Sequence, residues 1–142
     1  MQVFIVGSPL ETAMGLDKRR LNRQIQETKV ILDALNGAKA WSKHPCTLQY
    51  LDSILWLRNY MKCLDCYQKG DMISAELFSG ACDCIRPPFH TQEYFDQMKR
   101  RLYTKDPVYY EQWEHLGESE DNWYWSQREN KFIKYRNGKR ID

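Results

Sequence analysis

The chain has 142 residues, a length that suits one domain, so we expect residues 1–142 to form a single domain. Hydrophobic residues make up 42% of it and charged residues 28%, with seven Gly and five Pro, which excludes a disordered or fibrous protein. No apolar run approaches the ~20 residues that cross a bilayer, and the first six residues lack the basic start of a signal peptide. We therefore expect a cytoplasmic protein without a membrane partner.

The net charge of +2 conceals an uneven distribution of charge along the chain. Residues 17–43 carry seven basic and three acidic side chains, and residues 128–142 carry six basic and two acidic ones. Residues 106–121 carry six acidic side chains and no Lys or Arg. Two basic segments are compatible with a phosphate-binding face, from which the acidic stretch should point away; a solvated surface of mixed charge is the alternative.

Five cysteines, an odd number without a secretory signal, argue against a disulfide framework and favour a reducing compartment. Cys63-x-x-Cys66 together with Cys82-x-Cys84 could form a four-thiolate zinc site. The first pair lies in a strongly helical segment and the second has a one-residue spacer, so we expect small buried thiols, no metal and no cofactor.

The first long helix is predicted to begin after Asp17, a good N-cap, and to end near Asn36-Gly37. Its apolar stripe consists of Leu21, Ile25, Thr28, Leu32 and Leu35. Steps of four and three describe one buried helical face.

A second helix is predicted over residues 45–69, wide enough in its apolar face to be the centre of a bundle. Its apolar residues are Ile54, Leu57, Met61 and Leu64, widened by Leu51, Leu55 and Trp56. Residues 71–88 read as an irregular connection with room for a short helix, and residues 91–104 as a third helix. Asp106-Pro107 marks a further helix start. We therefore predict a mainly α, single-domain helical bundle of three or more helices with irregular connections.

The C-terminal part is rich in aromatic and basic residues. Residues 123–125 and 132–135 are candidates for a small β-hairpin, and residues 128–142 form either a basic tail or part of that hairpin. Trp123 and Trp125 could stack on exposed bases while neighbouring cations follow the backbone of a nucleic acid. The alternative is an aromatic tail packed on the bundle.

One side of the first helix combines a carboxylate with cations. Arg20, Arg23, Gln24 and Glu27 lie within about a third of a turn of each other, beside the apolar stripe. Arg23 is placed to keep Glu27 ionised, and the same arginines could bind a phosphate; an ordinary surface ion pair is the alternative. His44 could carry a proton, donate to a phosphate or cap the next helix. No Gly-rich phosphate loop is present, which argues against a nucleotide-dependent enzyme.

Several short motifs follow one another along the chain: Met1-Gln2, Leu16-Asp17-Lys18-Arg19-Arg20-Leu21-x-Arg23-Gln24-x-x-Glu27 with Ile31-Leu32, Trp41-x-Lys43-His44-Pro45, Lys69-Gly70, Pro87-Pro88-Phe89, Lys105-Asp106-Pro107-x-x-Tyr110 and Trp123-Tyr124-Trp125. Taken in this order, they resemble the pyrimidine-dimer DNA glycosylase (endonuclease V) family, in particular its small phage and bacterial members.

The resemblance implies a DNA repair glycosylase with abasic-site lyase activity, acting as a monomer on double-stranded DNA that carries a lesion or modified base. In the family an N-terminal amine attacks C1′, expels the base and forms an imine that permits strand cleavage. Carried over, the catalytic groups are Glu27 and the amine of Met1 or Gln2. The implied DNA contacts are Arg19, Arg20, Arg23, Gln24, Lys43, His44, Trp123 and Trp125.

Two departures from the family pattern affect these roles. Gln2 is too large for ordinary Met removal, so the amine would belong to Met1 unless another protease acts. Many relatives carry His-x-Ser-His before Lys-Asp-Pro, whereas residues 95–98 contain no histidine. The sequence therefore leaves two other functions open: a non-catalytic nucleic-acid-binding relative, and a protein-interaction module that uses residues 106–121.

Overall fold

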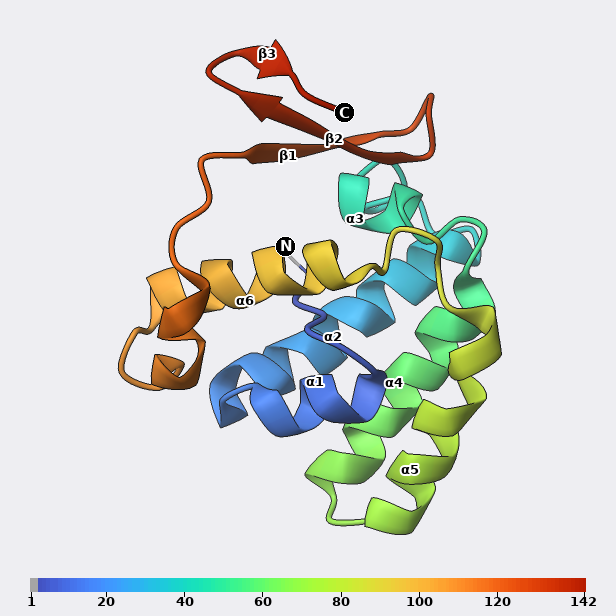
Figure 1. Ribbon diagram of the computed structural model, residues 1–142. Helices are drawn as coiled ribbons and strands as arrows, with labels where there is room; N and C mark the ends of the chain where they lie inside the picture. Colours follow the sequence, from blue (N-terminus) through green and yellow to red (C-terminus); the bar gives the residue numbers. More distant parts are fainter. Residues whose placement is uncertain (1–2) are drawn as a thin grey trace.

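A computed structural model describes residues 3–142. Its helices are α1 (Pro9–Gly15), α2 (Lys18–Leu35), α3 (Pro45–Leu48), α4 (Ile54–Gln68), α5 (Met72–Ala81) and α6 (Gln92–Lys105), with 3₁₀ helices η1 (Asp83–Ile85) and η2 (Glu111–Leu116). The strands β1 (Asn122–Ser126), β2 (Lys131–Arg136) and β3 (Lys139–Arg140) form one antiparallel sheet in that order (Figure 1). The predicted mainly α fold is confirmed.

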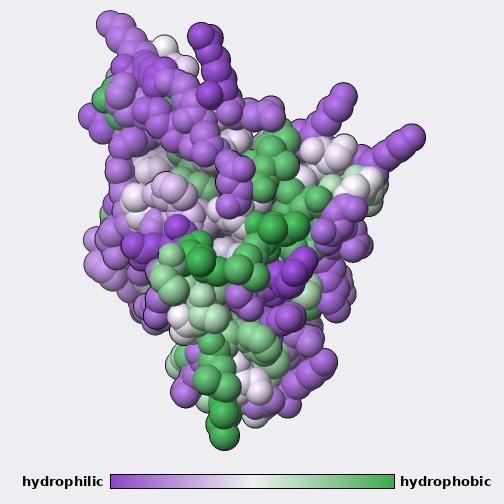
Figure 2. All heavy atoms as spheres, turned by 90° about the vertical axis from the view of Figure 1, so that its right-hand side faces the viewer, coloured by the Kyte–Doolittle hydropathy of each residue, from purple (hydrophilic) through white to green (hydrophobic). Residues whose placement is uncertain are grey.

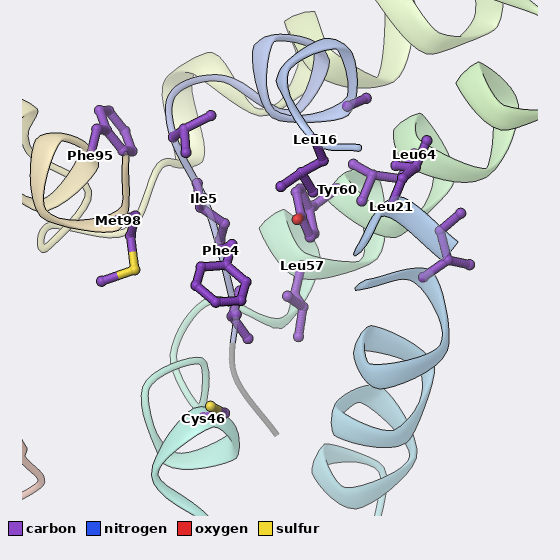
Figure 3. Packing of buried hydrophobic residues seen from close by; sticks show 14 of the residues in the cluster. Phe4, Ile5, Leu16, Leu21, Cys46, Leu57, Tyr60, Leu64, Phe95 and Met98 are labelled. Atoms are coloured by element: carbon purple, nitrogen blue, oxygen red, sulfur yellow. The ribbon is translucent and has the colours of Figure 1, made fainter. Parts of the chain in front are cut away.

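Residues 3–6 form an extended segment in the interior of the bundle. All four side chains are buried, and Ile5 is fully inaccessible. Figure 3 shows this segment between α6, which contributes Phe95 and Met98, and α4, which contributes Leu57 and Tyr60. The core therefore forms around the start of the chain, which passes α2 on its way to α1.

The helix predicted to follow Asp17 is α2. The Asp17 carboxylate accepts a hydrogen bond from the Arg20 N–H, and Gly37 adopts the positive φ of 110° that ends a helix. Four of the five predicted stripe residues are buried, Leu35 is partly buried, and Ile31 and Gln24 extend the buried face. Local caps and helical periodicity account for this element.

The single helix predicted over residues 45–69 is wrong, because the chain turns between α3 and α4. The turn buries Tyr50, whose hydroxyl forms a 2.9 Å hydrogen bond with His90 Nε2, and Ser53 has a non-helical φ of −136°. Leu51 and Leu55 were expected to widen the buried stripe but are about half exposed. Leu55 lies two positions before buried Leu57, about 160° away around α4, so it faces solvent.

The stretch predicted as irregular contains α5, a ten-residue helix that begins after the Asp71 cap and packs along α4. Its outer face is apolar: Ile73 and Leu77 are exposed, as is Met72. Figure 2 shows the apolar side chains that gather on this side of the molecule. The third predicted helix is confirmed as α6, whereas Asp106-Pro107 introduces a turn and η2 rather than an α-helix.

The predicted C-terminal hairpin is confirmed, with Trp123 opposite Lys134 and Trp125 opposite Phe132. In Figure 1 it lies at the end of the molecule opposite to α5. The Phe89 ring contacts Trp125 and Phe132 at 5.1 and 5.6 Å between centroids, which attaches the sheet to the loop before α6. No helix within residues 3–142 is long and apolar enough to cross a membrane.

Candidate active site

Arg23 and Glu27 form an ion pair one turn apart on α2. The distance from Arg23 Nε to Glu27 Oε1 is 3.3 Å. The Arg23 side chain is 68% exposed, whereas that of Glu27 is only 17% exposed. The Glu27 carboxylate is therefore a recessed group beside an exposed cation, at the boundary between the buried and solvent faces of the helix.

Two grooves meet at this pair and share Arg19, Arg23 and Glu27. The Trp41 groove, of about 840 Å³, is lined by Lys18, Arg19, Asn22, Arg23, Gln26, Glu27, Val30 and Trp41. The Lys105 groove, of about 390 Å³, is lined by Phe4, Arg19, Arg20, Arg23, Gln24, Glu27 and Lys105. Glu27 is the single acidic residue in either lining, so both grooves favour an anionic ligand.

Gln24 forms the floor of the Lys105 groove and fixes the extended segment to α2. Its Oε1 accepts hydrogen bonds from the Phe4 N–H at 3.3 Å and from the Tyr60 hydroxyl at 3.1 Å. On the other side, the Val3 backbone hydrogen-bonds Cys46 in α3, while burial raises the pKa of the Cys46 thiol. The extended segment is thus bound to α2 through Phe4 and to α3 through Val3, and its partner on α2, Gln24, lies three positions before Glu27.

Arg20 is positioned by a network at the start of α2. It contacts Asp17 at 3.1 Å and Asp106 at 3.9 Å, and its guanidinium lies 5.8 Å from the centre of the Tyr110 ring. Partial burial would raise the pKa of Asp17, but hydrogen bonds from Tyr110 and Arg20 outweigh it and lower that pKa. The acidic stretch was expected to face away from the basic surface; for Asp106 this is wrong, because it lies beside Arg20.

His44 caps α3 and lies next to Trp41. Its Nδ1 accepts the Cys46 N–H at 3.1 Å, so the neutral ring carries its proton on Nε2. The rings of His44 and Trp41 meet edge to face at 5.3 Å. Burial lowers the pKa of His44, against the opposing charge of Glu27, which favours the neutral form near pH 7. Lys43 is exposed on the same connection.

Trp123 and Trp125 do not line either groove. Both pack against Phe132 on the inner side of the sheet, and neither indole N–H has a hydrogen-bond partner among the described residues. The exposed aromatic residue of β1 is Tyr124, whose ring lies 5.8 Å from that of Tyr135. Trp123 and Trp125 therefore pack on the protein, which was the alternative to stacking on bases.

Half of the cations in the second basic segment, residues 128–142, are paired with acidic neighbours. Three of its cations form ion pairs: Lys134 with Glu93, Arg136 with Asp121, and Arg140 with both Glu129 and Asp142. The distances are 2.9 to 3.0 Å. These three cations are thus less available to a phosphate than unpaired cations would be.

Sequence reasoning did not assign Phe4, Trp41 or Lys105 to the site. Trp41 and Lys105 belong to quoted motifs, but only the packing of distant elements brings them to the grooves. The sequence feature that could have assigned Trp41 to the site is its position, since it is a large aromatic residue in a short polar connection.

The cysteines do not assemble into the zinc site that was considered. Within residues 3–142, no group of three or more His, Cys, Asp or Glu side chains is arranged to hold a metal ion. Burial raises the pKa of both Cys63 and Cys82 to about 12, and the Cys82 thiol donates to the Trp56 carbonyl at 3.7 Å.

Comparison with known proteins supports the resemblance found in the sequence. Residues 1–66 match the model of a family described as pyrimidine dimer DNA glycosylase, and the match contains both grooves except for Lys105. No curated protein and no solved structure matches the chain. The recessed carboxylate Glu27 lies within the matched segment, and residues 1–66 are similar to the pyrimidine dimer DNA glycosylase family.

Proposed function

We propose that this protein is a DNA N-glycosylase with associated abasic-site lyase activity, acting on pyrimidine dimers or other damaged or modified bases in double-stranded DNA. The observation that carries the proposal is the position of Glu27, a recessed carboxylate at the junction of two cationic grooves. Cationic grooves bind the phosphate backbone, and a carboxylate between them can act on the sugar that the phosphates flank.

The proposed reaction begins with attack of a neutral amine on C1′ of the damaged nucleotide. The bond from C1′ to the base breaks, and the base leaves with its electron pair and takes up a proton. Opening of the sugar ring gives an imine between the amine nitrogen and C1′. Loss of a proton from C2′ then expels the phosphate from C3′. Glu27 transfers protons and stabilises the cationic imine.

The extended segment supports an amine near Glu27. Met1 and Gln2, the candidate nucleophilic residues, lie outside the described residues. Two residues span at most about 7 Å, so chain length limits an amine on Met1 or Gln2 to about that distance from Val3. An α-amine has a pKa of about 7.7–8.0, which leaves a reactive neutral fraction near pH 7.

The DNA-binding roles divide between α2 and the connection after it. Arg19, Arg20 and Arg23 would bind phosphates in the Lys105 groove. Lys43 and the Nε2–H of His44, on the connection that carries Trp41, are candidates for further contacts with DNA. Gln24 is proposed as a positioning residue, because its side-chain oxygen already binds Phe4 and Tyr60.

Strand cleavage of dimer-containing and abasic duplexes tests this function. Glu27→Gln preserves shape and should abolish cleavage while changing the Kd for DNA less than about threefold. Asp33→Asn is the matched control, because Asp33 is an exposed carboxylate on α2 outside both grooves. Cleavage by Glu27→Gln at the wild-type rate, or no cleavage by wild type on either duplex, contradicts the proposal.

A non-catalytic DNA-binding protein is the second candidate, favoured by Gln2, which disfavours release of Met1. It predicts DNA binding that weakens steeply with salt, with no cleavage of any duplex by the wild-type protein.

A further inference from the structure

The outer face of α5 exposes large apolar side chains to solvent. Ile73 is 76% exposed and Leu77 is 70% exposed, whereas Ala75 and Ser79, on the opposite side of the helix, are buried. Large apolar side chains that are exposed side by side are typical of an interaction surface. In Figure 1, α5 lies at the outer edge of the bundle, so another molecule can reach this face.

Gly80 continues the line of Ile73 and Leu77 along α5. The three residues are four and three positions apart, so they lie within about 60° of one another around the helix. This is the spacing of residues along the seam between two packed helices. A Cβ at Gly80 would extend into open space, and Gly80 does not have a positive φ, so nothing in residues 3–142 requires glycine there. Glycine stabilises a helix less than alanine does, and the close approach of a second helix accounts for its presence.

The two flanks of this face carry opposite charges. Lys62 of α4 is exposed, and its Nζ lies 5.5 Å from the centre of the Phe78 ring on one flank of α5. Glu76 is exposed on the other flank, about 160° from Phe78 around the helix, with Leu77 between them. Within residues 3–142, neither Lys62 nor Glu76 forms an ion pair. Each charge is therefore available to an opposite charge on a partner.

We propose that α5 binds α5 of a second copy of this chain, with the two helices parallel and a two-fold axis along the seam of Ile73, Leu77 and Gly80. Each seam residue then lies against its counterpart in the other copy. The two-fold rotation also brings the Glu76 flank of each copy opposite the Lys62 flank of the other, which allows two ion pairs in the dimer. An antiparallel pair would instead bring the two Glu76 flanks together.

The proposed dimer is independent of the proposed catalysis. The resemblance to a glycosylase family implied a monomer, and the face of α5 is the observation that argues for a pair of chains. No residue of α5 lines the Trp41 groove or the Lys105 groove. Pairing through α5 therefore does not use the lining of either groove, and the dimer carries two of each.

Sedimentation equilibrium without DNA tests the dimer. The mass of the wild-type protein should rise from 17.1 kDa at low concentration to twice that value at high concentration, and no further. Leu77→Glu places a charge on the seam and should keep the protein monomeric, and its Tm should equal that of wild type at concentrations where both are monomers. Val108→Glu is the matched control, because Val108 is an 87% exposed apolar residue in the turn before η2, and it should dimerise as wild type does.

Gly80→Ala distinguishes a seam between two chains from an ordinary helix surface. Alanine stabilises the helix, so the variant should unfold at a higher temperature than wild type under monomeric conditions. Its added methyl group lies on the seam, so the same variant should raise the Kd of the dimer roughly 5- to 100-fold.

Reversal of the flanking charges tests the parallel arrangement. Glu76→Lys and Lys62→Glu should each raise the Kd of the dimer about 3- to 30-fold. The double variant Glu76→Lys/Lys62→Glu restores opposite charges across the seam and should return the Kd to within about threefold of wild type. A double variant that dimerises no better than the two single variants overturns the parallel arrangement.

Three other results overturn the dimer itself. The first is a wild-type protein that stays monomeric at every concentration, which would leave the face of α5 to a different protein. The second is assembly beyond two copies. The third is a Leu77→Glu or Gly80→Ala variant that dimerises with the wild-type Kd.

Discussion

Replacement of Gln24 by Leu tests how the interior of the bundle supports the site. Gln24 is 2% exposed, and its Oε1 binds the Phe4 N–H and the Tyr60 hydroxyl, both in the core. Leucine has a similar size but no acceptor, so the substitution leaves two buried donors without this partner. Each such donor costs about 1–3 kcal/mol, and the expected loss of unfolding free energy is about 2–6 kcal/mol.

The double variant Gln24→Leu/Tyr60→Phe separates this explanation from a general packing defect. Removal of the Tyr60 hydroxyl eliminates one unpaired donor, so the double variant should be about 1–2 kcal/mol more stable than Gln24→Leu alone. Urea unfolding measures the differences, which correspond to roughly 3–5 °C in Tm for each kcal/mol. A loss below about 0.5 kcal/mol in Gln24→Leu, or a double variant less stable than the single one, refutes the reasoning.

Three further changes probe charge at the site and away from it. Arg23→Ala removes an exposed cation of the groove and should weaken DNA binding about 3- to 10-fold. Fluorescence anisotropy at several salt concentrations should show the slope of log K against log salt reduced by about 1, and an unchanged slope would place Arg23 outside the DNA interface. Lys134→Ala should leave binding within about twofold, because Lys134 is paired with Glu93; a loss equal to that of Arg23→Ala would make the sheet part of the DNA-binding surface. The lowered pKa of Asp17 contributes stability that is present above its ordinary value of 3.8 and lost as pH falls through the folded value. Asp17→Asn should therefore cost about 1–2 kcal/mol at pH 7 and less at pH 3, and an equal cost at both pH values contradicts the network.

The parts of the fold that could be predicted from the sequence depend on local interactions. The cap at Asp17, the stop at Gly37 and the apolar stripe between them define α2, and the ion pair of Arg23 with Glu27 follows from their i,i+4 spacing. The hairpin follows from two aromatic runs separated by turn residues.

The parts that could not be predicted depend on contacts between distant residues. The break before α4 accompanies the burial of Tyr50 against His90, forty positions away. Lys105 reaches the groove only because α6 passes near the Phe4 segment, and its Nζ lies 5.9 Å from the centre of the Phe4 ring. The orientation of the tryptophans depends on Phe132 within the sheet and Phe89 outside it, so the sequence left open whether they stack on bases or pack on the protein.

Borohydride reduction during reaction with abasic DNA tests the central claim most directly, because it converts an imine into a stable covalent bond. The account predicts an adduct in wild type that maps, after proteolysis and mass spectrometry, to the N-terminal peptide. Asp33→Asn should form it at the wild-type rate. Strand cleavage without any adduct, or an adduct that maps to a lysine such as Lys105, would contradict the N-terminal amine mechanism.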